Sequence, residues 1–282
     1  MSIKIAIVTG ANKGIGEGIV LHLAKQYKGD QKFLIYLTSR SEDLGKATLE
    51  KIRAELGSKY PNSEVDYHQL DVTKQSSIDK LAEYLKAKHG NQCVDILVNN
   101  AGWASKGPKV DYEIAKRTIG TNYYGLKNVT FTILPLMKMC GRIINISSTS
   151  GKLKILSPEL QKKYSDPNLT VEELDKLQDT FINAVKDNTF EQLGYPAQTY
   201  GVSKVGVIAL TKILARDYRH DPHNLFFAAL CPGWIRTDMA GPRATGTIDE
   251  GVQTPVYLAL TDESRVTSNS GEFWTRKTID IW

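Results

Sequence analysis

Cysteine and histidine are scarce in the 282-residue sequence, and neither is clustered. The three cysteines, Cys93, Cys140 and Cys231, form no CxxC pair, which argues against a disulfide framework or a zinc site. The five histidines are scattered, so we assign neither metal binding nor proton transfer to them. We therefore expect no metal, and the unpaired thiols are typical of a reducing compartment such as the cytoplasm.

Long apolar runs and long basic tracts are also missing. No stretch approaches the ~18 apolar residues of a membrane span, and the apolar run at 3–8 is too short for a secretion signal. The excess of 36 basic over 31 acidic residues gives a net charge of +5, without the Lys/Arg tracts of a nucleic-acid binder. We expect a cytoplasmic protein that binds neither nucleic acid nor a membrane.

Short apolar segments alternate with amphipathic ones along the chain. This pattern predicts an α/β fold, a doubly wound parallel sheet (Rossmann fold) with helices on both faces. Nothing marks a linker, so we expect a single dinucleotide-binding catalytic domain over 1–282, with a helical insertion at about 152–198. Buried strands are predicted at 3–8, 33–37, 65–69, 94–98, 142–146 and 225–230.

Two further segments have distinct patterns. The stretch that contains Asn122 is predicted to be helical as far as Met139, and an edge strand is predicted to begin at 271–274. Within the insertion, Thr170 to Glu173 form a capping-box sequence, followed by apolar residues at helical spacing. Because about 45 residues bury little core alone, we expect the insertion to pack onto the parent domain.

A glycine-rich turn follows the first predicted strand. Its glycines have the spacing G-x-x-x-G-x-G, which lets the backbone turn tightly and approach a ligand. The helix that follows offers free N–H groups to a pyrophosphate. A glycine turn alone is weak evidence, but this position favours a dinucleotide cofactor, bound by Gly10, Asn12, Lys13, Gly14, Ile15 and Gly16.

Arg40 stands at the end of the second predicted strand, where many NAD-binding folds carry an acidic residue for the ribose 2′-hydroxyl. A guanidinium can instead bind a 2′-phosphate, and Lys13 could add a second positive charge. The alternative is that both are ordinary solvated cations. We predict NADP(H) as the cofactor.

Polar residues at the ends of later strands are further cofactor candidates. Asp71, followed by Val72, could accept a hydrogen bond from an adenine amino group, or it could cap the next helix. The segment from Asn99 to Ala101 and Gly102 could hold a cofactor ribose, or simply bond loose backbone.

Tyr200 and Lys204 lie one helical turn apart on a predicted helix that ends near 218. A fixed positive charge favours the phenolate, so Lys204 is predicted to lower the pKa of Tyr200 from its usual value of ~10. Tyr200 thereby becomes a candidate general acid. Taken alone, such a pair also occurs by chance on many amphipathic helices.

Two other regions complete the predicted site. Ser148 follows the strand at 142–146 and could start a turn or donate to a substrate oxygen, and Asn122 has either a structural or a functional bond. After the strand at 225–230, the loop could meet the nicotinamide, with Trp234 and Met239 as walls of a substrate cleft. The predicted cofactor residues of this loop are Pro232, Gly233, Trp234, Ile235, Thr237, Asp238 and Met239.

These motifs together resemble the short-chain dehydrogenase/reductase family, and more narrowly the monomeric NADPH-dependent carbonyl reductases of animals. The resemblance is carried by the glycine turn, Asn99-Asn100-Ala101-Gly102, Ser148, Tyr200-x-x-x-Lys204 and Cys231-Pro232-Gly233-Trp234. It implies that NADPH reduces ketones, aldehydes or quinones, small-molecule carbonyl substrates. It also implies a monomer, because in this group the insertion covers the helices that otherwise form an oligomer interface.

The resemblance also implies roles for the site residues. Tyr200 would donate the proton, and Lys204 would lower its pKa and bind the nicotinamide ribose. Ser148, chosen over Ser147 on the family pattern alone, would orient the carbonyl, and Asn122 would support a proton-relay water. Two other functions remain: an alcohol or hydroxysteroid dehydrogenase working oxidatively, and a non-catalytic NADPH-binding sensor or scaffold.

Overall fold

The sheet at the centre of the molecule is mainly parallel. A computed structural model describes residues 3–107 and 109–282, and its eight strands in these ranges form one sheet in the order β3-β2-β1-β4-β5-β6-β7-β8. Only β8 runs antiparallel to its neighbour. The strands are β1 (Ile3–Val8), β2 (Lys32–Ser39), β3 (Ser63–Gln69), β4 (Val94–Asn99), β5 (Met137–Ile146), β6 (Phe226–Cys231), β7 (Phe273–Thr275) and β8 (Thr278–Asp280).

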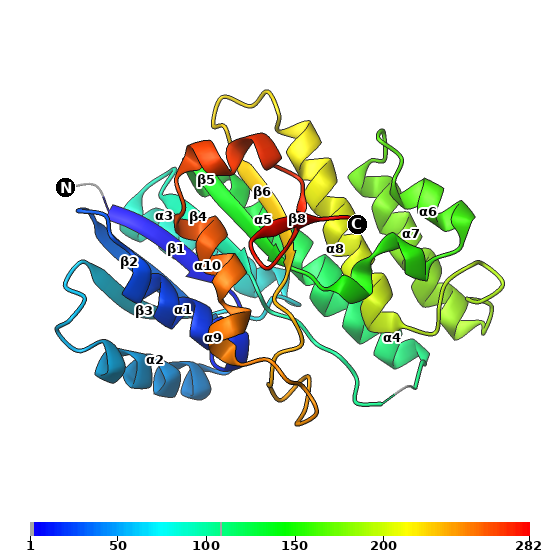
Figure 1. Cartoon of the computed structure of the whole chain (residues 1–282), viewed down its shortest axis with the longest axis horizontal. Helices are drawn as coiled ribbons and strands as arrows, with labels where there is room; N and C mark the ends of the chain where they lie inside the picture. The colour runs from blue at the N-terminus through cyan, green and yellow to red at the C-terminus, as the bar shows by residue number, and fades with distance from the viewer. Residues whose placement is uncertain (1–2, 108) are drawn as a thin grey trace.

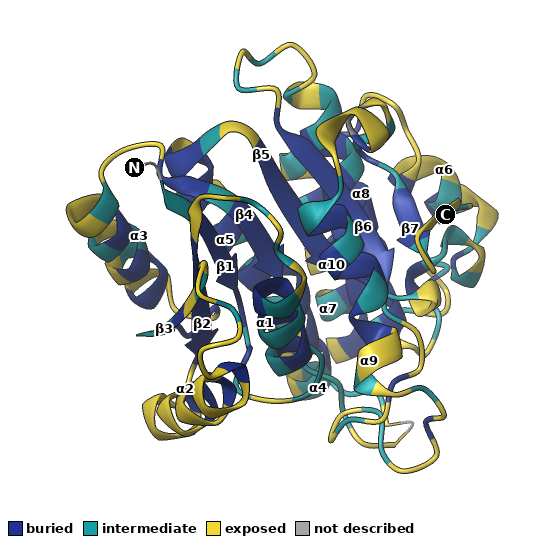
Figure 2. Cartoon of the chain, turned by 60° about the vertical axis from the view of Figure 1, so that its left-hand side comes forward, coloured by how far each residue is buried: buried dark blue, intermediate teal, exposed yellow. Residues whose placement is uncertain are grey.

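Helices cover both faces of this sheet, which confirms the predicted doubly wound α/β fold (Figures 1 and 2). One apolar core lies under α1 (Gly14–Gln26), α2 (Glu42–Leu56) and α10 (Gln253–Leu260). The other lies under α3 (Gln75–His89), α4 (Tyr112–Ile119), α5 (Leu126–Ile133) and α8 (Thr199–Asp217). The strand order reverses between β1 and β4, so the carboxyl ends of these strands flank a crevice of the kind that binds ligands in such sheets.

The helical stretch predicted to reach Met139 is shorter and less regular than expected. The π-helical turn η1 (Gly120–Gly125) separates α4 from α5, and a 3₁₀ turn, η2 (Leu134–Leu136), ends the stretch. Strand β5 begins at Met137, five residues before the predicted strand, because Lys138 ties this segment to the sheet. Its ammonium donates to the carbonyl oxygen of Ile3 at 2.6 Å and to Asp95 at 2.8 Å.

The predicted edge strand at 271–274 is not at the edge. Strand β7 pairs with β6 on one side and with β8 on the other, so β8 is the outer strand. The two-residue connection is made by Arg276 and Lys277, both with positive φ, at 48° and 63°. The sequence signal was weak here, because non-glycine residues seldom occupy both positions of such a turn.

The insertion folds as helices against the parent domain. Helices α6 (Pro158–Tyr164) and α7 (Val171–Lys186) form it, and the capping box at Thr170 is present. Asp175 on α7 accepts a hydrogen bond of 2.7 Å from the hydroxyl of Tyr123 and pairs with Lys127. Helix α7 thus packs against α4 and α8, and its Asp175 side chain reaches η1 and α5.

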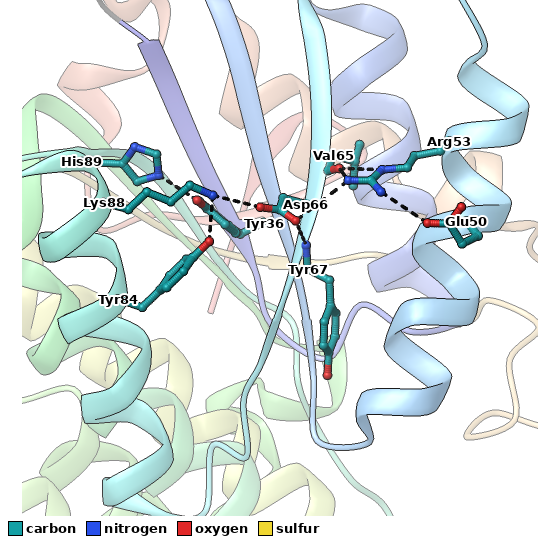
Figure 3. Close-up of polar contacts among 9 residues, drawn as sticks. All are labelled: Tyr36, Glu50, Arg53, Val65, Asp66, Tyr67, Tyr84, Lys88 and His89. Carbon is teal, nitrogen blue, oxygen red and sulfur yellow. Dashed lines mark hydrogen bonds and ion pairs between the residues drawn. The ribbon is translucent and has the colours of Figure 1, made fainter.

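The outer part of the sheet is fixed by polar contacts around Asp66 on β3 (Figure 3). Lys88 of α3 donates to Asp66 at 3.1 Å and to the Tyr84 hydroxyl at 2.8 Å. From α2, the guanidinium of Arg53 donates to the carbonyl oxygen of Val65 at 3.1 and 2.9 Å. Both helices are thereby attached to β3, near its amino end.

None of the helices built from residues 3–107 and 109–282 combines the length and the apolar character needed to cross a membrane.

Candidate active site

A cavity of about 710 Å³ lies at the carboxyl ends of the parallel strands. Its lining includes every predicted site residue except Asn99 and Asn122. Its size and position suit a cofactor together with a small substrate. The other lining residues were not among the predicted site residues, although Asn100 belongs to the segment that was expected to hold a ribose; they are Thr73, Asn100, Trp103, Ala104, Arg117, Thr121, Ile146, Ser147, Ser150, Arg236, Ala240 and Ile248.

The glycine turn is shaped for close backbone approach. Gly10 has φ of +62°, and a Cβ there would lie 2.8 Å from the Cα atom of Ala101. A Cβ on Gly16 would lie 2.5 Å from the side-chain nitrogen of Asn100. Lys13 is the N-cap residue of α1, and its side chain does not cap the helix. The first amides of α1 therefore have no side-chain cap. These features fit a pyrophosphate at the start of α1.

Asn100 is the residue that holds the glycine turn against β4. Its side-chain nitrogen donates to the carbonyl oxygens of Thr9 at 2.9 Å and Gly10 at 3.1 Å. Its own amide donates to the Thr9 hydroxyl at 2.9 Å. The paired asparagines were a signal in the sequence, but spacing alone did not separate the second from the first.

The side chain of Asn99, which was predicted to bind the cofactor, does not line the cavity. Its side chain is buried and donates to Thr130 at 2.9 Å and to Asn145 at 2.9 Å, behind the cavity wall. The last residue of a strand alternates faces with the next residue, and here Asn99 turns inward. Asn100, Ala101 and Gly102 line the cavity instead.

Asp71 lines the cavity and does not cap a helix. One carboxylate oxygen accepts bonds from the amide of Thr73 at 3.1 Å and from its hydroxyl at 2.7 Å. The N-cap of α3 is Lys74, which makes no side-chain cap. The helix-capping alternative for Asp71 is therefore wrong, and Asp71 lines the cavity at the carboxyl end of β3.

Two cations were predicted to meet a 2′-phosphate, and the structure places them differently. Arg40 is exposed, lines the cavity beyond β2 and pairs with no carboxylate among the described residues. Lys13 instead forms an ion pair of 2.7 Å with Asp238, across 225 positions of sequence. This hydrogen bond holds the pKa of Asp238 below its usual value. Arg40 is the cation that is free for a phosphate.

Asn122 lies in the π-helical turn η1 and is completely buried. Its oxygen accepts from the amide of Trp103 at 2.7 Å, and its nitrogen donates to the carbonyl oxygen of Trp103 at 2.9 Å. A further bond of 3.0 Å reaches the hydroxyl of Ser203. Of the two alternatives left open by the sequence, the structural bond is present. Asn122 fixes the loop after β4 from behind the cavity wall.

Ser148, Tyr200 and Lys204 come together at the end of β5. Lys204 on α8 has its ammonium 5.6 Å from the ring centre of Tyr200. Ser148 and Tyr200 line the same part of the cavity, and the Ser148 hydroxyl is near enough to oppose the rise in the pKa of Tyr200. Ser147 has a different position, because its hydroxyl donates to the carbonyl oxygen of Lys204 at 3.1 Å. The arrangement presents two hydroxyl groups and one ammonium to a single point in the cavity.

The pKa values of this pair correct one prediction. Lys204 was predicted to lower the pKa of Tyr200. Burial instead raises that pKa above its ordinary value. The nearby Cys231 adds to the rise, and the Ser148 hydroxyl opposes it. Burial also lowers the pKa of Lys204 to about 8. Desolvation disfavours both charged forms, and here it outweighs their proximity.

The cavity continues into a second hollow that has both apolar and charged lining residues. Trp234 and Met239, which line the cavity, are 57% and 47% exposed. The second hollow, of about 1080 Å³, shares Trp103, Arg236 and Met239 with the first. Among the described residues, no three potential metal ligands are grouped together.

Comparison with known proteins agrees with this geometry. The family model for short chain dehydrogenases matches residues 4–159, which is more than half of the chain. The chain belongs to the short-chain dehydrogenase family. Carbonyl reductase [NADPH] 1 of Homo sapiens is 38% identical over 286 residues, which cover 99% of both chains.

Solved structures of other short-chain dehydrogenases have the same fold. Salutaridine reductase from Papaver somniferum superposes with a TM-score of 0.83 at 29% identity, over 96% of this chain and 99% of that one. NADPH-bound carbonyl reductase from chicken fatty liver has a TM-score of 0.70 at 25% identity, over the full length of both chains. The fold and the cavity described above are therefore those of a family of reductases.

Proposed function

We propose that this short-chain dehydrogenase is an NADPH-dependent carbonyl reductase that converts ketones, aldehydes or quinones into alcohols or hydroquinones. It is an oxidoreductase with NADP(H) as its cofactor, as the relatives named for NADPH support. The observation that carries the proposal is that Ser148, Tyr200 and Lys204 line one cavity, with the Lys204 ammonium 5.6 Å from the centre of the Tyr200 ring.

The residues of the cavity account for cofactor binding. The free amides at the start of α1 would hold the pyrophosphate, and Arg40 the 2′-phosphate. Asp71 would accept from the adenine amino group, and the loop from Pro232 would meet the nicotinamide end. When bound, NADPH supplies the hydride.

The protein's own contribution is to bind the carbonyl oxygen and to move a proton. Ser148 and Tyr200 donate hydrogen bonds to that oxygen, and both bonds strengthen as negative charge grows on it. Tyr200 then gives its proton, and such acid catalysis typically contributes ~10²- to 10⁴-fold. With a pKa of about 8, Lys204 is mostly protonated at neutral pH, so its charge stabilises the phenolate that remains.

The proposed physical state is a cytoplasmic monomer. Helix α7 covers α4 and α8, and its Asp175 bonds to Tyr123 and Lys127. In the group that the chain resembles, this cover occupies the surface that forms an interface in other members. Light scattering of the purified protein tests this, and a stable dimer would contradict it.

The proposed reaction is tested by loss of NADPH absorbance with a panel of quinones, aryl ketones and aldehydes. We expect turnover with several of them and much slower oxidation of the corresponding alcohols by NADP⁺. Faster alcohol oxidation would favour the alcohol or hydroxysteroid dehydrogenase alternative. NADPH binding without turnover of any compound would favour a sensor or scaffold.

A further inference from the structure

An arginine at the cavity mouth has no assigned role in the proposed reaction. Arg117 lies on α4, is exposed, and lines the cavity together with Trp103. Its guanidinium carbon lies 4.3 Å from the centre of the Trp103 ring. Among the described residues, no carboxylate pairs with it. A cation held on an aromatic face and left without an anion is arranged to receive one.

The position of Arg117 separates it from the cofactor phosphates. Arg40 and Asp71 follow β2 and β3, at one end of the crevice. Helix α4 instead packs against α8, which carries Tyr200, and against α7. Trp103 belongs to both hollows, so Arg117 lies at the side where a substrate would enter next to the reacting hydroxyl.

The unpaired charged residues of the second hollow, near Arg117, are also positive. Lys106, Arg236 and Arg243 line the second hollow, and none of them pairs with a carboxylate among the described residues. Asp238 is the one acidic residue of its lining, and Lys13 already pairs with it. The entrance therefore attracts anions over a distance of about one Debye length, ~10 Å at moderate salt.

Trp103 gives this charge a defined orientation. Stacking on the indole fixes the plane of the guanidinium, so its N–H groups point along that plane to a planar carboxylate. The loop that carries Trp103 is itself fixed, because the buried Asn122 bonds to both the amide and the carbonyl oxygen of Trp103. Arg117 is thus held by a positioned aromatic ring and not by a mobile surface loop.

We propose that Arg117 selects carbonyl substrates that also carry a carboxylate, which it binds through its guanidinium at the mouth of the cavity. This inference rests on the proposed function and names the substrate class of the same site. The carboxylate does not take part in the chemistry. Its binding places the ketone carbon of the same molecule beside Ser148 and Tyr200.

The test compares acids with their neutral esters. The probes are 4-oxo-4-phenylbutanoate and 5-oxo-5-phenylpentanoate, each measured against its methyl ester by loss of NADPH absorbance. We expect kcat/KM to favour at least one acid over its ester by about fivefold, the scale of a well-oriented exposed ion pair. Raising the salt from about 50 mM to about 500 mM should reduce this preference.

Three variants assign the preference to one side chain. Arg117→Gln should lose the preference for the acid, with ester reduction and the KM for NADPH unchanged. Arg117→Lys keeps the positive charge but loses the planar guanidinium, so it should retain part of the preference for the acid. Lys116→Gln is the matched control, because Lys116 lies on the same helix, 5.7 Å from the Tyr112 ring, and outside the cavity lining.

The outcomes separate this inference from the function on which it rests. If the wild-type protein reduces the esters but prefers neither acid, the inference is overturned and the carbonyl reductase proposal stands. The same holds if Arg117→Gln slows acid and ester equally, or changes only the KM for NADPH. If neither acids nor esters nor any other carbonyl compound is reduced, both proposals fail.

Discussion

The ammonium of Lys204 donates a hydrogen bond of 2.7 Å to the carbonyl oxygen of Ile146, the last residue of β5. This bond ties α8 to the carboxyl end of the central sheet, two residues before Ser148. The distance from Lys204 to the Tyr200 ring is therefore fixed by the sheet as well as by helical spacing. Any ligand that reaches Tyr200 meets a cation whose position is already set.

Replacing Tyr200 by phenylalanine tests the proton donor. Tyr200→Phe keeps the ring in place and removes the hydroxyl, so kcat should fall by about 10²- to 10⁴-fold. NADPH affinity, measured by fluorescence titration, should change little. Tyr218→Phe removes a phenol from the C-cap of the same helix and should leave kcat unchanged. Near-normal turnover of Tyr200→Phe would exclude the proposed mechanism.

The role of Arg40 is tested by cofactor preference. Arg40→Asp replaces the cation with a carboxylate that repels a 2′-phosphate and can accept from a ribose hydroxyl. The ratio of kcat/KM for NADPH to that for NADH should drop by at least about tenfold, as expected for losing a charge-assisted bond. Lys59→Asp makes the same charge change outside the cavity and should leave the ratio unaltered. An unchanged ratio in Arg40→Asp would place the discrimination elsewhere.

Lys204 should lower the stability of the protein in the absence of cofactor. Its pKa falls from 10.5 to about 8 on folding, so below pH 8 burying the charged form costs free energy. Between pH 8 and 10.5 the unfolded chain holds more protons at this residue, and the cost declines as pH rises. Lys204→Met should therefore raise the free energy of unfolding by about 1–2 kcal/mol at pH 7.

Denaturant unfolding of both proteins at pH 7 and near pH 10 measures this difference. The gain of Lys204→Met should shrink at the higher pH, while its reductase activity is lost at both. A variant that is less stable than the wild type at pH 7 would show that the bond to Ile146 outweighs desolvation of the ammonium.

Asp175 should be important for holding the insertion in place. Tyr123 is completely buried, and Asp175→Ala would leave its hydroxyl without the acceptor that it has now. The expected loss in the free energy of unfolding is about 2 kcal/mol. Asp179→Ala removes one of the two acceptors of the less buried Tyr124 and leaves the carbonyl oxygen of Asp175, so its effect should be smaller. Denaturant titration measures the free energy of unfolding of both variants. Equal losses would mean that the burial of Tyr123 does not explain the effect of Asp175→Ala.

Local patterns predicted the strands and the cavity because each depends on neighbouring residues. The glycine turn and the Tyr200–Lys204 pair follow from periodicity and from the rule that ligands bind where parallel strands end, whereas Ser148 was chosen over Ser147 on the family pattern alone. The pKa of Tyr200 could not be predicted in the same way. Spacing shows that a cation is near, whereas burial depends on everything packed around the hydroxyl.

Contacts between distant segments account for the other differences. Lys13 and Asp238 were each assigned to the cofactor, but no sequence pattern showed that they pair with each other. Asn99 and Asn100 differ only in the face of the strand end to which they turn. Strand β5 begins early because Lys138 finds acceptors on β1 and β4, which are remote in sequence.

The π-helical turn at Gly120–Gly125 makes the cleft sensitive to chain length. Each residue of a helix advances the chain by about 100° around the axis, so removing one from this turn would restore an ordinary α-helix and rotate α4 against α5 by about that angle. Arg117 on α4 would lose its contact with Trp103, although neither of these two residues had been substituted. An insertion or deletion in this turn would therefore reshape the mouth of the cavity without substituting any side chain that lines it.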